Sequence, residues 1–139
     1  MSKHFTLKEF LRSDTALSKK IENLPTWEVI DNLKELAEFL EGLREAWRKP
    51  INITSGYRST ELNKEVGGVQ RSAHKLGYAA DLQPANGDMD GFKKVVLEWV
   101  KDKKFDQCII EKSGKTEWIH ISLFNEDNEQ RGMVFKLKV

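Results

Sequence analysis

The stretch Ser72-Ala73-His74-Lys75-Leu76-Gly77-Tyr78-Ala79-Ala80-Asp81 combines an imidazole, a glycine and a carboxylate within a short segment. The residues from 78 to 82 predict a β-strand, in which successive side chains point to opposite faces. His74 then lies in the loop before the strand, and Gly77 lets the chain fold back between the two. We therefore predict that this stretch presents His74 and Asp81 to one site.

A third polar side chain fits the same site. The chain has three histidines, and His4 lies near a terminus. His120 stands in the otherwise apolar strand pattern Glu117-Trp118-Ile119-His120-Ile121-Ser122, and burying an imidazole without a partner is costly. Catalytic zinc sites keep three protein ligands and leave the fourth position to water. We predict one zinc ion held by His74, Asp81 and His120; the alternative for His120 is a core histidine satisfied by a neighbour.

Hydrolysis at such a site also needs a carboxylate to move protons. Glu117, three residues before His120, is the first choice for the general base because it is closest in sequence. Strict alternation puts it on the strand face opposite His120, so this role requires a bulge or an incoming turn. Glu111, across the predicted hairpin, is the second choice. The alternative for either glutamate is an ordinary solvated acid, one of 22 acidic residues.

Four residues are candidate substrate contacts. Arg58 follows the strand predicted over 51–57, and its planar fork suits a carboxylate or a developing oxyanion, which would also make it catalytic. A surface salt bridge is the alternative for Arg58. Tyr57 directly precedes Arg58 and is also predicted to contact the substrate. Ser72 either binds a ligand or caps its loop, and Trp118 either forms a wall of the cleft or fills the core.

The rest of the chain carries helix signals first and strand signals later. Thr6-Leu7-Lys8-Glu9 is a capping box that opens a short helix. Apolar residues from Val29 to Trp47 recur at alternating steps of four and three, which predicts one helix of about 20 residues ended by Lys49-Pro50. Such an order is typical of an α+β domain with N-terminal helices packed on a mostly antiparallel sheet. The other predicted helices cover 15–21, 59–66 and 88–104, and the predicted strands cover 51–57, 78–82, 105–111, 118–123 and 133–139.

The composition limits the class of protein. The 139 residues suit a single domain, 1–139, and 39% hydrophobic with 32% charged residues indicates a soluble globular chain. A net charge of +1 argues against a nucleic-acid partner. The single cysteine, Cys108, cannot form an internal disulfide and lies in an apolar run. The N-terminus shows no signal peptide and no stretch long enough to span a membrane, so we expect synthesis in the cytoplasm. Separately, we expect the protein to be a monomer.

Several motifs together resemble one known family. They are Ser55-Gly56-Tyr57-Arg58-Ser59, then Gly67-Gly68-Val69, then the segment 72–81, and then Glu117-Trp118-Ile119-His120. In this order they resemble the zinc D-Ala-D-Ala carboxypeptidases, the phage L-alanyl-D-glutamate endopeptidases and the vancomycin-resistance D,D-dipeptidases. The match runs from about residue 51 to 123, and the opening Phe5-Thr6-Leu7-Lys8-Glu9-Phe10 resembles short members from phages and gut bacteria.

The resemblance implies a small α+β fold shared with Hedgehog-type signalling domains. It implies zinc on His74, Asp81 and His120, substrate contact by Arg58, and general-base catalysis by Glu117. It also implies that the chain hydrolyses an amide bond in the stem peptide of peptidoglycan, after export or cell lysis. The alternative from a different class is a zinc-containing cell-wall-binding or interaction module without catalytic activity.

Overall fold

The computed structural model describes residues 1–139 and contains five α-helices, two 3₁₀ turns and one five-stranded sheet. The helices are α1 (Leu7–Leu11), α2 (Asp14–Lys19), α3 (Trp27–Trp47), α4 (Thr60–Glu65) and α5 (Met89–Trp99), with 3₁₀ turns η1 (Ala73–Leu76) and η2 (Val100–Asp102). The strands are β1 (Ile51–Ser55), β2 (Ala79–Pro84), β3 (Gln107–Ser113), β4 (Thr116–Ser122) and β5 (Met133–Lys138). This is the α+β arrangement predicted from the sequence.

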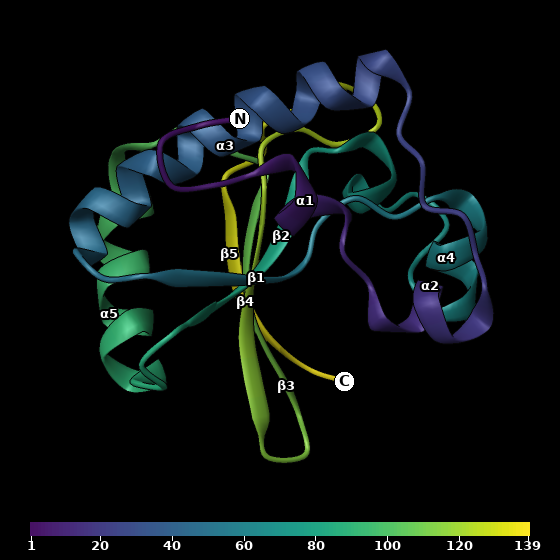
Figure 1. The fold of residues 1–139 in the computed structure, drawn as a ribbon. Helices are drawn as coiled ribbons and strands as arrows, with labels where there is room; N and C mark the ends of the chain where they lie inside the picture. Colours follow the sequence, from purple (N-terminus) through teal and green to yellow (C-terminus); the bar gives the residue numbers. More distant parts are fainter.

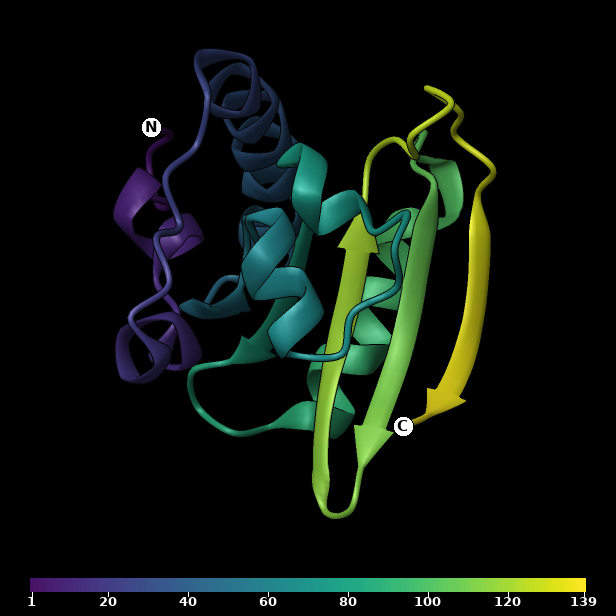
Figure 2. The same cartoon turned by 90° about the vertical axis from the view of Figure 1, so that its right-hand side faces the viewer.

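The strands lie in the order β1-β2-β4-β3-β5. The pairs β1–β2, β2–β4 and β3–β4 are antiparallel, whereas β5 joins the outer edge of β3 in parallel. The expectation of a mostly antiparallel sheet is therefore confirmed. Figure 2 shows β5 at one edge of the sheet, with α4 and η1 in front of the strands and α5 behind them.

The two faces of the sheet are covered differently. On the face toward α5, side chains of β2, β3 and β4 join one apolar cluster with α1, α3 and α5. In the view of Figure 1, α5 stands on one side of the strands, and α2 and α4 stand on the other. The face toward α4 and η1 carries Asp81, Glu111 and His120. The sheet therefore separates the core from the candidate site.

Helix α3 supplies one wall of the core, as its apolar stripe predicted. The residues on its inward face are all buried. Burying one valine or leucine side chain stabilises the folded state by about 1.5–3 kcal/mol relative to leaving it exposed. Thr26 begins the helix by accepting a hydrogen bond from the Val29 N–H, and Arg48 ends it in a left-handed conformation. These buried residues are Val29, Leu33, Leu36, Ala37, Leu40, Leu43 and Trp47.

Helix α1 begins as the sequence predicted. The Thr6 side chain accepts a hydrogen bond from the Glu9 N–H, and the Glu9 side chain accepts one from the Thr6 N–H. This capping box fixes the start of a helix with a single buried residue, Phe10. The short helix thereby holds Phe10 against the core.

Some element ends differ from the predicted ones. β1 stops at Ser55, because Thr54 forms a bulge and the Tyr57 N–H donates instead to the Phe10 carbonyl at 2.7 Å. β2 continues through Pro84, which we expected only after the strand. Pro84 lies opposite Ile51 beyond the last residue that pairs with β4, so its missing N–H leaves no partner unsatisfied.

The expectation that Cys108 is a buried small hydrophobe is confirmed. Its burial raises the pKa of the thiol to about 12. The side chain therefore belongs to the core and stays protonated at neutral pH. None of the helices combines the length and apolar character that crossing a membrane requires.

Candidate metal centre

His74, Asp81 and His120 come together on the sheet face opposite α5. One ligand atom from each lies within 4.8 Å of the other two. His74 Nε2 lies 3.2 Å and His120 Nδ1 lies 3.1 Å from Oδ1 of Asp81. All three residues are buried. The three side chains thus form a compact group of possible metal ligands.

Strand pairing brings two of the three together. Asp81 of β2 lies directly opposite His120 of β4 in the antiparallel ladder. Residues opposite each other in a ladder share a sheet face, with Cβ atoms about 4.5–5.5 Å apart. Ile119 and Ile121 alternate with His120 and point into the core cluster. The alternation predicted for this strand is present.

Local turn geometry presents His74 from the third element. Ser72 accepts a hydrogen bond from the His74 N–H at 3.2 Å and so begins the turn η1. Gly77 ends η1 with φ +79°, and a Cβ there would lie 2.8 Å from the Val29 carbonyl oxygen. Only glycine fits this left-handed position against α3. The fold-back expected at Gly77 is therefore observed, with His74 in a 3₁₀ turn rather than a loop.

A hydrogen bond behind His74 fixes which nitrogen faces the site. His74 Nδ1 lies 2.7 Å from the Gly56 carbonyl oxygen, which can only accept, so Nδ1 carries the hydrogen. Burial lowers the pKa of His74, although Asp81 opposes this shift, so the ring is neutral at neutral pH. Nε2 of His74 is then a bare lone pair directed at the Asp81 carboxylate.

The charge state of Asp81 completes this arrangement. Burial alone would raise the pKa of Asp81, but the imidazoles of His74 and His120 against its carboxylate hold this pKa well below the usual range. His74 Nε2 and Asp81 Oδ1 therefore lie 3.2 Å apart, and each has a lone pair that a metal ion could accept. A cation between them would satisfy both lone pairs. The donor set thus fits a metal ion.

Two of the three separations between ligand atoms agree with a tetrahedral ion. Ligand bonds of about 2.0–2.2 Å at the tetrahedral angle separate neighbouring ligand atoms by about 3.3–3.6 Å. The two measured separations from Asp81 Oδ1, 3.2 and 3.1 Å, are close to this value. Two imidazoles and one carboxylate also match the three protein ligands of catalytic sites. His74, Asp81 and His120 can therefore hold one metal ion.

Arg58 lies behind the carboxylate of Asp81. Its guanidinium Nη2 donates to Oδ2 of Asp81 at 3.3 Å, its Nε donates to Ser55 Oγ at 3.0 Å, and its Nη1 donates to Asn63 Oδ1 at 3.3 Å. Burial lowers the pKa of Arg58, and the charges of Asp81 and Glu111 oppose that shift. Arg58 thus orients one ligand, leaving Oδ1 to face the imidazoles. It keeps two further N–H groups for a substrate.

Glu111 lies on the same sheet face as the three ligands. β3 and β4 pair Ile109 with His120 and Glu111 with Trp118, so Glu111 is one step along the sheet from the metal ligands. Burial raises the pKa of Glu111, and the charge of Asp81 raises it further, whereas His120 lowers it. A half-buried carboxylate with a raised pKa beside a metal site is suited to accept and release protons during catalysis.

Glu117, our first choice for the general base, lies on the other face. It shares the face of Ile119 and Ile121, and its carboxylate pairs with Lys93 of α5 at 3.1 Å. No bulge interrupts β4 there, because Glu117 pairs regularly with Lys112. The structure thus brings Glu111, and not Glu117, to the ligands, which reverses our order of preference.

The remaining predicted contacts lie around this group. Ser72 is buried and caps η1, which is the supporting role rather than ligand binding. Trp118 is half-buried beside Glu111; its indole N–H approaches this carboxylate closely enough to lower the glutamate pKa, without a hydrogen bond of ordinary geometry. Tyr57 is buried in the core cluster, with its hydroxyl 3.5 Å from the Leu24 carbonyl. Tyr57 therefore faces away from the ligands.

Sequence reasoning missed three residues that support the ligands. Gly56 supplies the carbonyl for His74, and Ser55 and Asn63 hold Arg58. Asn63 is buried and also donates to the Val69 carbonyl at 2.8 Å. The sequence placed Asn63 only within the predicted helix 59–66, where a polar residue normally faces solvent, so its inward position is known from the structure alone. The Gly56 carbonyl gave no sequence signal.

Comparisons with known proteins agree with this geometry. A segment of 44 residues is 46% identical to the zinc D-Ala-D-Ala carboxypeptidase of Streptomyces albus G, covering 31% of this chain and 17% of that protein. The chain therefore matches less than a fifth of the length of this relative. The family described as peptidase M15 matches residues 3–122, which include all three ligands and Glu111. The chain belongs to the peptidase M15 family.

Proposed function

We propose that this protein is a zinc-dependent peptidase that hydrolyses an amide bond in the stem peptide of peptidoglycan. The observation that carries the proposal is the grouping of His74, Asp81 and His120 within 4.8 Å, with one nitrogen of each histidine 3.2 and 3.1 Å from Oδ1 of Asp81. Membership of the peptidase M15 family supports a peptidase, and the similarity to a zinc D-Ala-D-Ala carboxypeptidase supports zinc and this substrate.

In this proposal each residue has a separate task. His74, Asp81 and His120 hold zinc, which when bound would supply an activated water and polarise the substrate carbonyl. Glu111 accepts a proton from the attacking water and passes it to the leaving amine. Arg58 keeps Asp81 oriented and offers its free N–H groups to a substrate carboxylate or to the oxyanion.

The arrangement of the site supports action by a single chain. All three ligands, Arg58 and Glu111 come from one chain, so we propose a monomer as the active form. Because peptidoglycan lies outside the cytoplasm, we propose that the protein meets its substrate after export or cell lysis.

Paired substitutions of the two glutamates test this function. Glu111→Gln should lower turnover by about 10²–10⁴-fold, because it removes proton transfer, while zinc content stays at the wild-type level. The matched control Glu117→Gln should keep turnover within a few-fold of wild type, because Glu117 pairs with Lys93 on the opposite face. Mass spectrometry of products from purified peptidoglycan, with and without a chelator, measures both.

The product masses also distinguish the bond that is cut. Release of terminal D-alanine would identify a carboxypeptidase, and cleavage between L-alanine and D-glutamate would identify an endopeptidase. Unchanged turnover in Glu111→Gln would remove the proton-transfer role. Bound zinc without any product in the wild type would instead support a wall-binding module.

A further inference from the structure

The outer edge of β1 is an open sheet edge. β1 is the first strand in the order and pairs only with β2. The Pro50 carbonyl accepts a hydrogen bond from the Ala85 N–H at 3.1 Å, so Pro50 and Ala85 form a hydrogen-bonded pair. Pair types alternate along an antiparallel ladder, and the residues of the next pair, Ile51 and Pro84, are therefore not hydrogen-bonded to each other. Two residues further, Ile53 opposite Leu82 is a pair of the same kind. The N–H and C=O of Ile53 therefore point away from β2.

These two backbone groups have no partner within the chain. No backbone or side-chain hydrogen bond reaches the N–H or C=O of Ile53 from the facing helices α1 and α2. Instead, a hollow of about 350 Å³ separates the edge from those helices. Ligand pockets are typically about 300–1,000 Å³, so the hollow is large enough for a small ligand. An exposed edge with an unpaired donor and acceptor is a template for an added strand.

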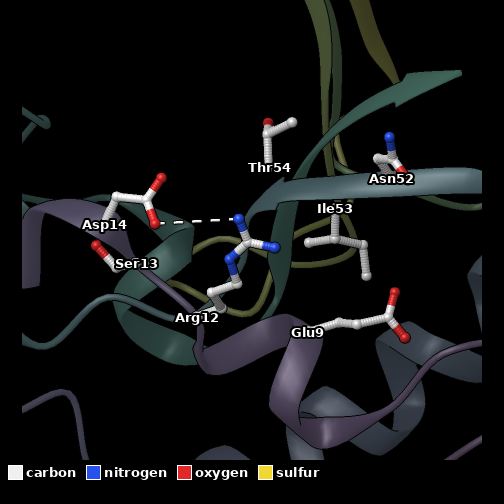
Figure 3. A pocket seen from close by; sticks show the side chains of 7 residues that line it. All are labelled: Glu9, Arg12, Ser13, Asp14, Asn52, Ile53 and Thr54. Carbon is white, nitrogen blue, oxygen red and sulfur yellow. Dashed lines mark ion pairs between the residues drawn. The ribbon is translucent and has the colours of Figure 1, made fainter. Parts of the chain in front are cut away.

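The wall opposite the edge carries both signs of charge. It consists of Glu9, Arg12, Ser13 and Asp14. Figure 3 shows the Arg12 guanidinium in front of the strand, between Asp14 and Ile53. Arg12 and Asp14 are only 4.0 Å apart and mostly exposed, so their ion pair is weak and available for exchange. The wall thus offers a cation for a carboxylate and acids for an ammonium group.

The hollow continues toward the metal ligands. A second hollow of about 300 Å³ shares Arg12, Ser13, Asp14 and Thr54 with the first. Its lining also includes Ser55 and Arg58, and Arg58 binds Asp81. From Asn52 to Ser55 the edge spans about 10 Å, the length of roughly three extended residues. A short peptide lying along β1 would therefore end beside the residue that holds a metal ligand.

We propose that this trough, between β1 and the residues Glu9, Arg12 and Asp14, is a second peptide-binding site. It takes a short extended peptide with a free carboxylate, which pairs its backbone with Ile53 and its carboxylate with Arg12. If the proposed function holds, on which this identification rests, the occupant is an uncleaved stem peptide beside the one at the metal centre. Only one residue of the bound peptide pairs with Ile53, so the alternating L- and D-residues of a stem peptide do not prevent this pairing.

A binding experiment that needs no turnover tests the trough. The ¹⁵N-labelled protein is titrated with trialanine, a zwitterionic peptide, and with trialaninamide, which lacks the carboxylate. Trialanine should shift the amide resonance of Ile53, and trialaninamide should bind at least about fivefold more weakly, since one charged contact is lost. Binding in the millimolar range is expected, because exposed hydrogen bonds and ion pairs contribute little each.

Two variants separate a specific contact from general charge. Arg12→Gln should weaken trialanine binding by at least about fivefold, whereas Lys136→Gln, on the far edge strand β5, should leave it unchanged. An unshifted Ile53 amide, equal binding of the amide peptide, or an equal loss in Lys136→Gln would overturn the site.

The natural occupant is tested separately from the proposed function. A stem tetrapeptide titrated into the Glu111→Gln protein should shift the Ile53 amide as trialanine does. Absence of that shift would rule out the cell-wall occupant. Absence of turnover on peptidoglycan, by contrast, would count against the proposed function and leave the trialanine result standing.

Discussion

Two buried aspartates in this protein have opposite surroundings. Asp106, just before β3, accepts hydrogen bonds from the Arg131 backbone N–H at 3.1 Å and from its Nε and Nη2 at 2.8 and 3.0 Å. Asp81 also has an arginine partner on Oδ2, but its Oδ1 faces a nitrogen of each of two imidazoles, at 3.2 and 3.1 Å. Burial and an arginine partner are thus common to both, and the difference lies in the remaining neighbours.

This difference separates a structural carboxylate from a ligand. Both oxygens of Asp106 have protein donors, so the group needs nothing further and secures the chain before β5. Asp81 instead has two imidazole nitrogens 3.2 and 3.1 Å from its Oδ1, an arrangement in which all three groups can bind one metal ion. A buried acid therefore points to a metal when imidazole nitrogens surround one of its oxygens, and to the fold when an arginine satisfies both oxygens.

The largest expected effect comes from changing Asp81. Asp81→Asn keeps the shape of the side chain but removes the charge that a metal requires, so metal affinity should fall by more than about 100-fold, beyond the loss typical of residues behind a ligand. Competition with a chromophoric chelator measures this affinity. An unchanged metal affinity in Asp81→Asn would contradict the distinction between Asp81 as a metal ligand and Asp106 as a structural residue.

A smaller loss is expected behind Asp81. Arg58→Lys keeps the positive charge but cannot make the three separate contacts to Asp81, Ser55 and Asn63. Metal affinity should fall by about 10–100-fold, as is usual when a partner of a ligand is changed. The same chelator titration applies, and Arg131→Lys, the matched change beside Asp106, should leave metal affinity unaltered.

Asp106→Asn should affect stability instead of metal binding. The free energy of unfolding should fall by about 1.5–3 kcal/mol, the scale of hydrogen bonds to a charged group. Burial would raise the pKa of Asp106, but the Arg131 hydrogen bonds lower it overall. Its stabilisation is therefore present above the ordinary aspartate pKa and disappears as the pH falls through the lower, folded-state value.

Urea unfolding of Asp106→Asn across acidic pH measures this effect. The difference in unfolding free energy between Asp106→Asn and wild type should be largest at neutral pH and decrease toward low pH. The zinc stoichiometry should stay unchanged. A loss of zinc would contradict the separation of the two aspartates.

The smallest effect is expected at Cys108. Because burial raises the thiol pKa to about 12, the folded protein should react with iodoacetamide far more slowly than the unfolded chain at pH 8. The folded state keeps its proton above the ordinary thiol pKa whereas the unfolded chain loses it, so this burial lowers stability at high pH. Rapid labelling of native protein would show that Cys108 is accessible.

Local patterns in the sequence predicted most of the fold. The capping box at Thr6, the apolar stripe of α3 and the alternation along β4 each depend on neighbours a few residues apart. The parallel pairing of β5 with β3 was not predictable, because register between distant strands depends on the whole sheet.

The candidate site was predictable in part for the same reason. Alternation correctly separated His120 from its neighbours and argued against Glu117, but closeness in sequence still favoured Glu117 over Glu111. Glu111 is near the ligands only through the β3–β4 ladder. The Gly56 carbonyl behind His74 depends on how two loops meet in the folded chain, which no local pattern encodes.

Gly56 also links the N-terminal helix to the metal ligands. A Cβ at this position would lie 2.4 Å from the Phe10 carbonyl oxygen, and the Gly56 carbonyl itself accepts the Nδ1 hydrogen of His74. The main chain of α1 therefore forms the back support of a ligand that lies more than 60 residues later in the sequence. Removing α1 would take away the main chain against which Gly56 packs, so a truncation that deletes this helix is expected to disturb the position of His74.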